Sequence, residues 1–271
     1  MNVLLGHSQK DRKKHCADGD SVYITGSFCN ELVRLVGIDA LETRGLDLDK
    51  LEESMAFYVL DDKLLKYLRP KLTEESIETH KQLGFKAKEY LESILAENLR
   101  VSFGEEVFDR YGRALVYVGD GQEVYNVTLV KEGLAIPYFI FPNAVPLTDE
   151  GEYSFDHIKT MQKVTTCAQE KKLGIWKVLD DILIPMELRY LTRREPPEKY
   201  CADLQTGVLY PPQMYYTVAL VDRLFFYPKD VILAVCMGFN PVAECDSWLH
   251  KIWRGLHPER VLRERPEIPK F

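Results

Sequence analysis

Two short apolar runs near the start of the chain constrain its fold more than any other feature. Residues 21–25 and 31–38 are rich in Val, Leu and Ile, and Gly26-Ser27 between them is typical of a turn. The runs therefore predict an antiparallel hairpin. Antiparallel pairing places the start of one strand beside the end of the other, so we expect Asp20 and Asp39 to be neighbours.

Helical patterns follow this hairpin, and strand patterns return after them. Helices are expected over 46–81, with a fresh start at Thr73-Glu74-Glu75, and over 85–99, 124–131 and 154–173; strands are expected over 100–103 and 113–118. Gly133 and Gly174 end the last two helices, because glycine takes the left-handed conformation cheaply. Strands with helices packed around them within residues 1–177 predict an α+β domain with a small, mostly β barrel as its core.

The remaining third of the chain reads as a separate unit. Two adjacent prolines and five charges over 193–199 cannot pack as a helix or a central strand. We therefore expect a linker over 178–199 and a C-terminal extension of unknown fold over 200–271.

Composition limits the classes of partner. The chain has 271 residues, 46% of them hydrophobic, with 35 basic against 42 acidic residues and a formal net charge of −7. An acidic protein does not bind nucleic acid indiscriminately, because affinity for phosphate backbones comes from Lys and Arg. A nucleic-acid partner would need a local positive site.

The apolar runs, the first residues and the cysteines of the chain indicate its cellular compartment. The longest apolar run, 231–239, is about half of the roughly 20 residues that a membrane span needs, so no membrane association is expected. The first 16 residues lack the apolar stretch of a secretory signal, and six cysteines without a CxxC pair indicate free thiols. A reducing cytoplasm suits this pattern.

The ends of the predicted hairpin carry the first group of residues with chemistry. Asp20 and Asp39 would repel each other unless a cation lies between them, and oxygen ligands select Ca²⁺ or Mg²⁺. Arg34, inside an apolar strand, would face the same phosphodiester as that metal. The alternatives are ordinary: an Asp-Gly turn, an arginine at a sheet edge, and carboxylates that cap the next helix.

A second group lies in the segment 109–113. Its simplest reading is a β-turn in which Gly112 supplies a positive φ. Its functional reading is that Arg113 provides a second guanidinium for the charge that builds during phosphoryl transfer, with Arg110 and Tyr111 at the rim of the pocket.

These motifs together resemble the staphylococcal-nuclease (thermonuclease) family over about residues 13–177. The matching blocks, in order, are Asp18-Gly19-Asp20-Ser21-Val22, Arg34, Asp39-Ala40-Leu41-Glu42, residues 109–113, residues 130–135 and Leu173-Gly174-Ile175-Trp176. Agreement of several blocks in order and spacing is far more specific than one Asp-Gly-Asp.

The resemblance implies a fold and a set of roles. It implies a five-stranded OB-fold barrel with helices and hydrolysis of DNA or RNA with Ca²⁺, although Mg²⁺ or another divalent ion is an alternative. Asp20, Asp39 and the Ala40 carbonyl resemble the metal ligands, and Glu42 resembles the carboxylate that orients or deprotonates the attacking water. The resemblance makes Arg34 and Arg113 the phosphate-binding pair, and Arg110 and Tyr111 the nucleotide-contacting turn.

Three departures from the family pattern affect the expected site. Ala40-Leu41 replaces the usual Thr-Pro, which frees the turn that aims Glu42. Base stacking should involve Tyr138, Phe139 and Phe141, with phenylalanine at the last two positions, where the family often has tyrosine. The segment 46–81, with nine acids against six bases, is expected to act as an acidic lid that favours short or single-stranded substrates.

The leading hypothesis is therefore a metal-dependent nuclease that cleaves phosphodiesters by in-line attack of water. The alternative is a non-catalytic OB-fold module that binds nucleic acid or protein. Retention of both acids, the third carboxylate and both arginines favours the enzyme. A third possibility is that the C-terminal region binds an unknown partner, with the nuclease as its effector.

Overall fold

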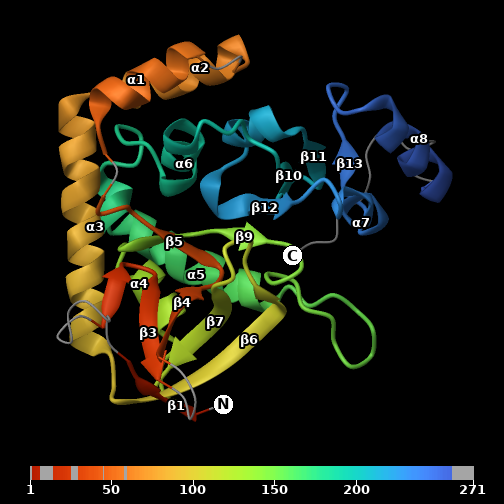
Figure 1. The fold of residues 1–271 in the computed structure, drawn as a ribbon. Coiled ribbons are helices and arrows are strands. Elements are labelled where there is room, and N and C mark those ends of the chain that lie inside the picture. The colour runs from red at the N-terminus through yellow and green to blue at the C-terminus, as the bar shows by residue number, and fades with distance from the viewer. Residues whose placement is uncertain (1, 7–14, 26–29, 45, 58–59, 258–271) are drawn as a thin grey trace.

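The protein consists of a β-barrel and a smaller second sheet stacked against it (Figure 1). The computed structural model describes residues 2–6, 15–25, 30–44, 46–57 and 60–257. The predicted Gly26-Ser27 turn lies outside these residues. None of the described helices is long and apolar enough to cross a membrane, and the described cysteines are free thiols.

Five strands close the barrel, as predicted. They are β1 (Asn2–Leu5), β3 (Ser21–Thr25), β4 (Asn30–Leu35), β6 (Asn98–Phe108) and β7 (Ala114–Gly119). They pair in the order β1-β6-β7-β4-β3, and pairing of β1 with β3 closes the ring. Alternate residues such as Val22 and Val33 fill the interior. A sixth strand, β2 (Cys16–Asp18), extends the sheet beside β3.

The predicted hairpin is confirmed in its register. β3 and β4 are antiparallel, and Ser21 lies opposite Arg34. The expected strand over 31–38 is interrupted, because Gly37 has a φ of +78° and turns the chain after β4. A separate strand, β5 (Ile38–Ala40), follows and pairs with β8 (Ala135–Pro137). This turn brings Asp39 back toward the start of β3.

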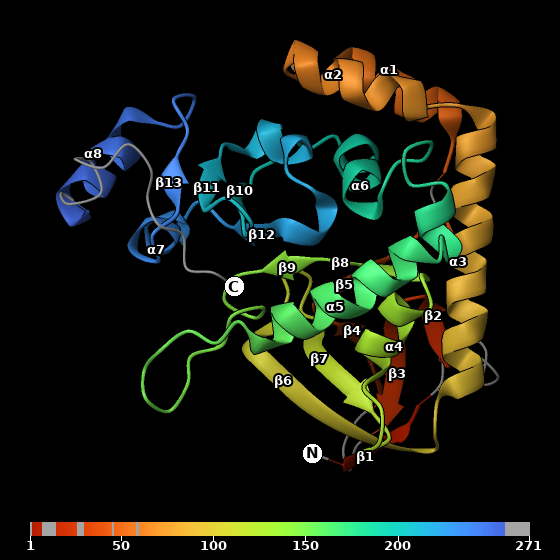
Figure 2. The same cartoon turned by 180° about the vertical axis from the view of Figure 1, so that it is seen from behind.

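Three helices cover the barrel, and the turns that follow two of them meet at glycines. They are α3 (Glu74–Ile94), α4 (Tyr125–Lys131) and α5 (Asp156–Glu170), and α4 and α5 lie on the barrel face seen in Figure 2. Gly133, which has a φ of +68°, ends the segment after α4, and Gly174 ends the segment after α5. The Ile175 amide donates to the Gly133 carbonyl at 2.9 Å, so these two sequence blocks pack together.

Helix α3 is longer than the sequence pattern predicted. Thr73 begins it as expected, since its hydroxyl accepts a hydrogen bond from the Ser76 amide at 3.1 Å. The helix then continues to Ile94 without a break, so the expected boundaries near 81, 85 and 99 were wrong. Gly84 lets the helix approach the Leu41–Glu42 segment: a Cβ at this position would meet the Leu41 carbonyl oxygen at 2.6 Å.

The first part of the insertion packs against the C-terminal region. It forms α1 (Leu48–Phe57), α2 (Asp62–Leu68) and the 3₁₀ helix η1 (Arg69–Lys71). Apolar residues of these helices, Leu51 and Leu64 among them, share a core with Leu188 and Tyr215. The insertion therefore supports the extension.

The expected linker over 178–199 is wrong. Residues in this range form α6 (Pro185–Arg193), and most of its side chains are buried. Prolines 196 and 197 follow the helix, where their lack of an amide hydrogen costs nothing. The two prolines at 196–197 exclude a helix only at their own positions, and they place no restriction on residues before 194.

The C-terminal extension is continuous with the barrel domain. Its strands are β10 (Tyr200–Asp203), β11 (Val208–Tyr210), β12 (Arg223–Phe226) and β13 (Asn240–Pro241), joined by η3 (Pro212–Thr217), η4 (Leu220–Asp222), α7 (Val231–Cys236) and α8 (Ser247–Leu256). β12 pairs in parallel with β9 (Phe139–Ile140) of the barrel region. Apolar residues of both regions share one core, so the expected division at 177 is not a structural boundary.

His80 connects three parts of the structure and predicts a pH dependence of stability. On α3, its Nε2 accepts from the Glu42 amide at 2.8 Å and its Nδ1 donates to the Leu183 carbonyl at 2.9 Å. Only the neutral ring makes both bonds. Burial lowers its pKa from 6.5 to about 4, whereas an unfolded chain keeps the higher value.

Acidification should therefore destabilise the protein through His80. Between pH 6.5 and 4 the unfolded state binds the extra proton, so stability falls as pH falls through this window. The contribution lost between pH 8 and pH 5 is about 2 kcal/mol. Urea unfolding of wild type and His80→Gln at both pH values measures it; the variant should lose about 2 kcal/mol less on acidification. His250→Gln is the control, and equal losses in all three proteins would contradict the assignment.

Candidate active site

The centre of the site is an ion network around Arg34 at the end of the barrel hairpin. The Ser21–Arg34 register places Arg34 beside Asp20, and the turn at Gly37 returns Asp39 to the same point. The Arg34 guanidinium contacts the Asp20 Oδ1 atom and reaches the Asp39 Oδ1 atom at 2.6 Å. The predicted proximity of the two carboxylates is confirmed.

Both carboxylates are buried, and their surroundings shift their pKa values in opposite directions. Asp20 is 1% exposed and Asp39 is 0% exposed. Burial raises the pKa of Asp20, and the nearby Arg34 only partly offsets it. Burial also acts to raise the pKa of Asp39, but Arg189 and Arg34 outweigh it and lower the value. Asp39 is thus the firmly ionised member of the pair.

Arg189 is a site residue that sequence reasoning missed. It lies on α6, and its guanidinium reaches Asp39 through Nη1 at 2.9 Å and Nη2 at 2.5 Å. The Nη1 atom is also 3.5 Å from the Glu42 Oε1 atom. Asp39 and Arg189 are 150 positions apart, and no local motif marks the arginine. The one available signal was a lone cation within the apolar sequence of 186–191.

Glu42 is held in place by α3 rather than by a proline. Its amide donates to His80, and Gly84 lets α3 pack directly on the Leu41 and Glu42 carbonyls. Leu41 itself is fully buried. The departure from Thr-Pro to Ala40-Leu41 therefore does not leave this turn loose, because α3 and the core restrain it.

The segment 109–113 forms the predicted turn. Asp109 accepts hydrogen bonds from the amides of Tyr111 at 2.8 Å and Arg113 at 2.9 Å, and Gly112 has a φ of +77°. The Asp109 carboxylate also holds the Arg113 guanidinium at 2.8 Å. Arg113 is therefore positioned by its own turn at the first residue before β7.

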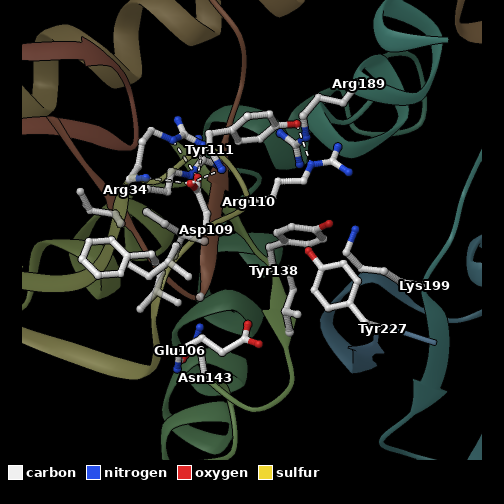
Figure 3. A pocket seen from close by; sticks show the side chains of 18 of the residues that line it. Arg34, Glu106, Asp109, Arg110, Tyr111, Tyr138, Asn143, Arg189, Lys199 and Tyr227 are labelled. Carbon is white, nitrogen blue, oxygen red and sulfur yellow. Dashed lines mark hydrogen bonds and ion pairs between the residues drawn. The ribbon is translucent and has the colours of Figure 1, made fainter. Parts of the chain in front are cut away.

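A pocket of about 580 Å³ brings most of the predicted residues together (Figure 3). Of the predicted residues, Arg34, Glu42, Arg110, Tyr111, Arg113 and Tyr138 line it. Asp20 and Asp39 lie behind Arg34, in the buried layer below the pocket wall. The described residues of 46–81 do not line the pocket, so the structure gives the expected acidic lid no support.

Two of the predicted stacking residues are in the core instead. Phe139 is 1% exposed and Phe141 is 4% exposed. Phe141 stacks on Phe226 of the extension, with ring centroids 5.2 Å apart. Their burial follows from the parallel pairing of β9 with β12, which covers this strand. Tyr138 alone of the three faces the pocket.

The proposed metal ligands have the right chemistry, but in this conformation their oxygens are engaged. Carboxylate oxygens suit Ca²⁺ or Mg²⁺. Here Asp20 accepts from Arg34 and from the Ala40 amide at 2.7 Å, while Asp39 accepts from Arg34 and Arg189. Among the residues that the structure describes, no three His, Cys, Asp or Glu side chains form a metal-binding group. The site as described does not fit a divalent ion unless Arg189 leaves Asp39.

A closed five-stranded barrel covered by helices defines an OB-fold protein, and its pocket is lined by arginines at the hairpin end. A family model described as "Staphylococcal nuclease homologue" matches residues 32–178. The chain is 30% identical over 165 residues to the Thermonuclease of Staphylococcus intermedius, covering 60% of this chain and 74% of that protein. It is 32% identical over 80 residues to the Thermonuclease of Staphylococcus hyicus, covering 30% of this chain and 41% of that protein. The chain belongs to the staphylococcal nuclease family.

The place of Arg189 predicts how one substitution changes metal binding. Arg189→Met removes a cation that any divalent ion at Asp39 must displace. Hydrogen bonds to charged groups are worth roughly 1.5–3 kcal/mol, so the Kd for Ca²⁺ should fall by about tenfold or more. Isothermal calorimetry with Ca²⁺ measures this change directly. Arg193→Met, on the same helix but without a carboxylate contact at the site, is the control; an unchanged or weaker affinity in Arg189→Met would contradict the prediction.

Proposed function

We propose that this protein is a nuclease that hydrolyses phosphodiester bonds of DNA or RNA. The observation that carries the proposal is the convergence of Arg34, Arg113 and Glu42 on one pocket. Two guanidinium groups and a carboxylate are the parts needed to bind a phosphodiester and to activate water against it. Membership of the nuclease family supports the same reaction class.

The two arginines bind the phosphate in this proposal. A guanidinium has five N–H donors, and Arg113 uses its Nε and Nη2 atoms on Asp109. Its other donors are available to a phosphate oxygen in the pocket. Arg34 is held by the two buried carboxylates, which fix the direction of its fork. Preorganised cations stabilise the charge that develops on the equatorial oxygens during transfer.

Glu42 is the proposed base for the attacking water. It lines the pocket, and its side chain is 29% exposed. Burial raises its pKa above the usual value, with Arg189 opposing the shift, which makes it a stronger base once ionised. Water attacks phosphorus in line, its proton passes to Glu42, a new P–O bond forms, and the bond to the 5′ oxygen breaks.

The family resemblance assigns Ca²⁺ to Asp20, Asp39 and the Ala40 carbonyl, and that assignment stays a prediction. Arginines engage both carboxylates in the described conformation, so an ion would have to displace them before it could bind. Mg²⁺ or another divalent ion would meet the same barrier.

The size of the pocket supports short or single-stranded substrates. A volume of about 580 Å³ lies within the range of roughly 300–1,000 Å³ typical of small-molecule sites. Such a pocket suits a few unpaired nucleotides. The volume of the pocket, rather than an acidic lid, supports this preference.

A non-catalytic nucleic-acid-binding module is the second candidate. The observation that favours it is that arginines satisfy both carboxylates, which leaves a stable cationic surface without a metal. The two candidates differ in whether a bound oligonucleotide is cleaved.

A cleavage assay decides between them. Labelled single-stranded DNA and RNA are incubated with the full chain in Ca²⁺, Mg²⁺ or EDTA, and products are resolved by length. Wild type should cleave, and Arg113→Ala and Glu42→Gln should each lower kcat/KM by roughly 10²–10³-fold, the cost of losing one transition-state contact. The exposed Arg254→Ala and Glu89→Gln are matched controls. Binding without cleavage in every metal would refute the enzyme and favour the module.

A further inference from the structure

Residues beyond 178, which comprise α6, the segment 194–199 and the C-terminal extension, form one wall of the pocket. Residues from this region that line it are Arg189, Arg193, Glu198, Lys199, Tyr227 and Lys229. All of them lie beyond residue 178, where the family match ends. The pocket of this chain is thus built from a family barrel and a second wall that the family motifs do not include.

This wall reverses the charge of the pocket. Among the described residues that line it, the region up to 178 contributes three cations, Arg34, Arg110 and Arg113, against four acids, Asp18, Glu42, Glu106 and Asp109. Residues beyond 178 contribute four cations, Arg189, Arg193, Lys199 and Lys229, against the single acid Glu198. Arg189 is paired with the buried Asp39, so Arg193, Lys199 and Lys229 are the cations that this wall adds for a polyanion.

Lys199 is the most enclosed of these added cations. Its residue is 8% exposed, yet it lines the pocket. The Nζ atom lies 4.8 Å from the centroid of the Tyr227 ring, and Figure 3 shows Lys199 beside Tyr138 and Tyr227. Burial acts to lower its pKa, but interactions with Tyr138, Tyr227 and Glu198 outweigh it, so the ammonium group stays charged.

The neighbouring acid does not satisfy Lys199 fully. Glu198 is 3.8 Å from the Lys199 Nζ atom and also pairs with Arg110 at 3.5 Å. Both distances exceed that of a good charged hydrogen bond, about 2.7–2.9 Å. An ammonium group has three donors. One is directed at Tyr138, and the long Glu198 contact leaves capacity for a stronger anionic acceptor in the pocket.

Tyr138 connects this cation to the proposed catalytic centre. The Arg189 guanidinium lies over the Tyr138 ring at 5.6 Å from its centroid, and Figure 3 shows Lys199 near the same tyrosine. Tyr138 is therefore next to a cation of the Asp39 network and next to Lys199. Adjacent phosphates of a single strand have a base and a sugar between them, which such a ring can contact.

We propose that Lys199, Tyr138 and Tyr227 form a second nucleotide subsite, which binds the phosphate next to the scissile one and stacks its base. The proposal rests on the proposed nuclease function for the identity of the scissile phosphate. It assigns the extension a role in substrate binding. The ligand class is a single-stranded oligonucleotide with at least two phosphodiester linkages.

The test removes one charge from the protein and one from the ligand. Labelled trithymidylate is compared with two isomers in which one linkage is an uncharged methylphosphonate. The Kd of each is measured by fluorescence anisotropy in a Glu42→Gln background, which prevents turnover. Lys199→Met keeps the aliphatic length of the side chain, Lys199→Arg restores the charge, and the exposed Lys163→Met on α5 is the control.

The proposal predicts coupling between Lys199 and one particular linkage. Lys199→Met should weaken binding of the all-phosphate ligand by about tenfold or more, the worth of a charged hydrogen bond. It should also erase the loss caused by methylphosphonate at one linkage but not at the other. Lys199→Arg should recover most of the affinity, and Lys163→Met should change nothing. Equal coupling to both linkages, or none, would overturn the subsite.

A second variant tests stacking and covers a failure of Lys199→Met to fold. Tyr227→Leu should weaken binding of trithymidylate by several-fold, since stacking of one base is worth roughly 1–3 kcal/mol. It should leave unchanged the Kd of a trinucleotide that lacks the stacked base. Equal loss for both ligands would overturn the proposal. Because these are binding measurements, a protein that cleaves nothing refutes the proposed function while the subsite is still decided.

Discussion

Burial of two carboxylates beside each other is the constraint on which this site depends. Asp20 and Asp39 have almost no contact with water, and buried charges are costly unless they are paired and hydrogen-bonded. Arg34, on β4, contacts both carboxylates, whereas Arg189, on α6, pairs with Asp39. One ion network therefore joins the barrel to the C-terminal region. A disturbance of either element exposes or leaves unpaired a charge in the other, so the site and the tertiary fold are energetically coupled.

The local charges of the pocket lining explain how an acidic protein can have a cationic pocket. The formal net charge of −7 describes the whole chain, but exposed charges further apart than about 8–10 Å are screened at ordinary salt. What a phosphate meets is the local lining. In this lining, residues beyond 178 add Arg193, Lys199 and Lys229 to the arginines of the barrel. The described acids of the insertion do not line the pocket.

The insertion and the extension also replace a local device of the family with a long-range one. A proline in the turn before Glu42 would restrict the backbone by itself. Here the turn lies against α3, where His80 binds the Glu42 amide and the Leu183 carbonyl together. The position of the carboxylate consequently depends on α3 and on the chain that precedes α6. This arrangement links the geometry of the pocket to the packing of two segments that lie outside the barrel.

Local periodicity and short motifs made several features predictable from the sequence. The β3–β4 hairpin, the start of α3 at Thr73, the turn at Gly112 and the convergence of Arg34 with Asp20 and Asp39 follow from strand alternation, capping and register, which act over a few residues. The other features depend on how distant segments pack. Arg189 reaches Asp39 across 150 positions, Phe139 and Phe141 are buried because β12 covers β9, and Lys199 meets Tyr138 because the second sheet packs on the barrel. Such pairings depend on which apolar surfaces find each other, and apolar burial is non-directional, so no local pattern encodes them.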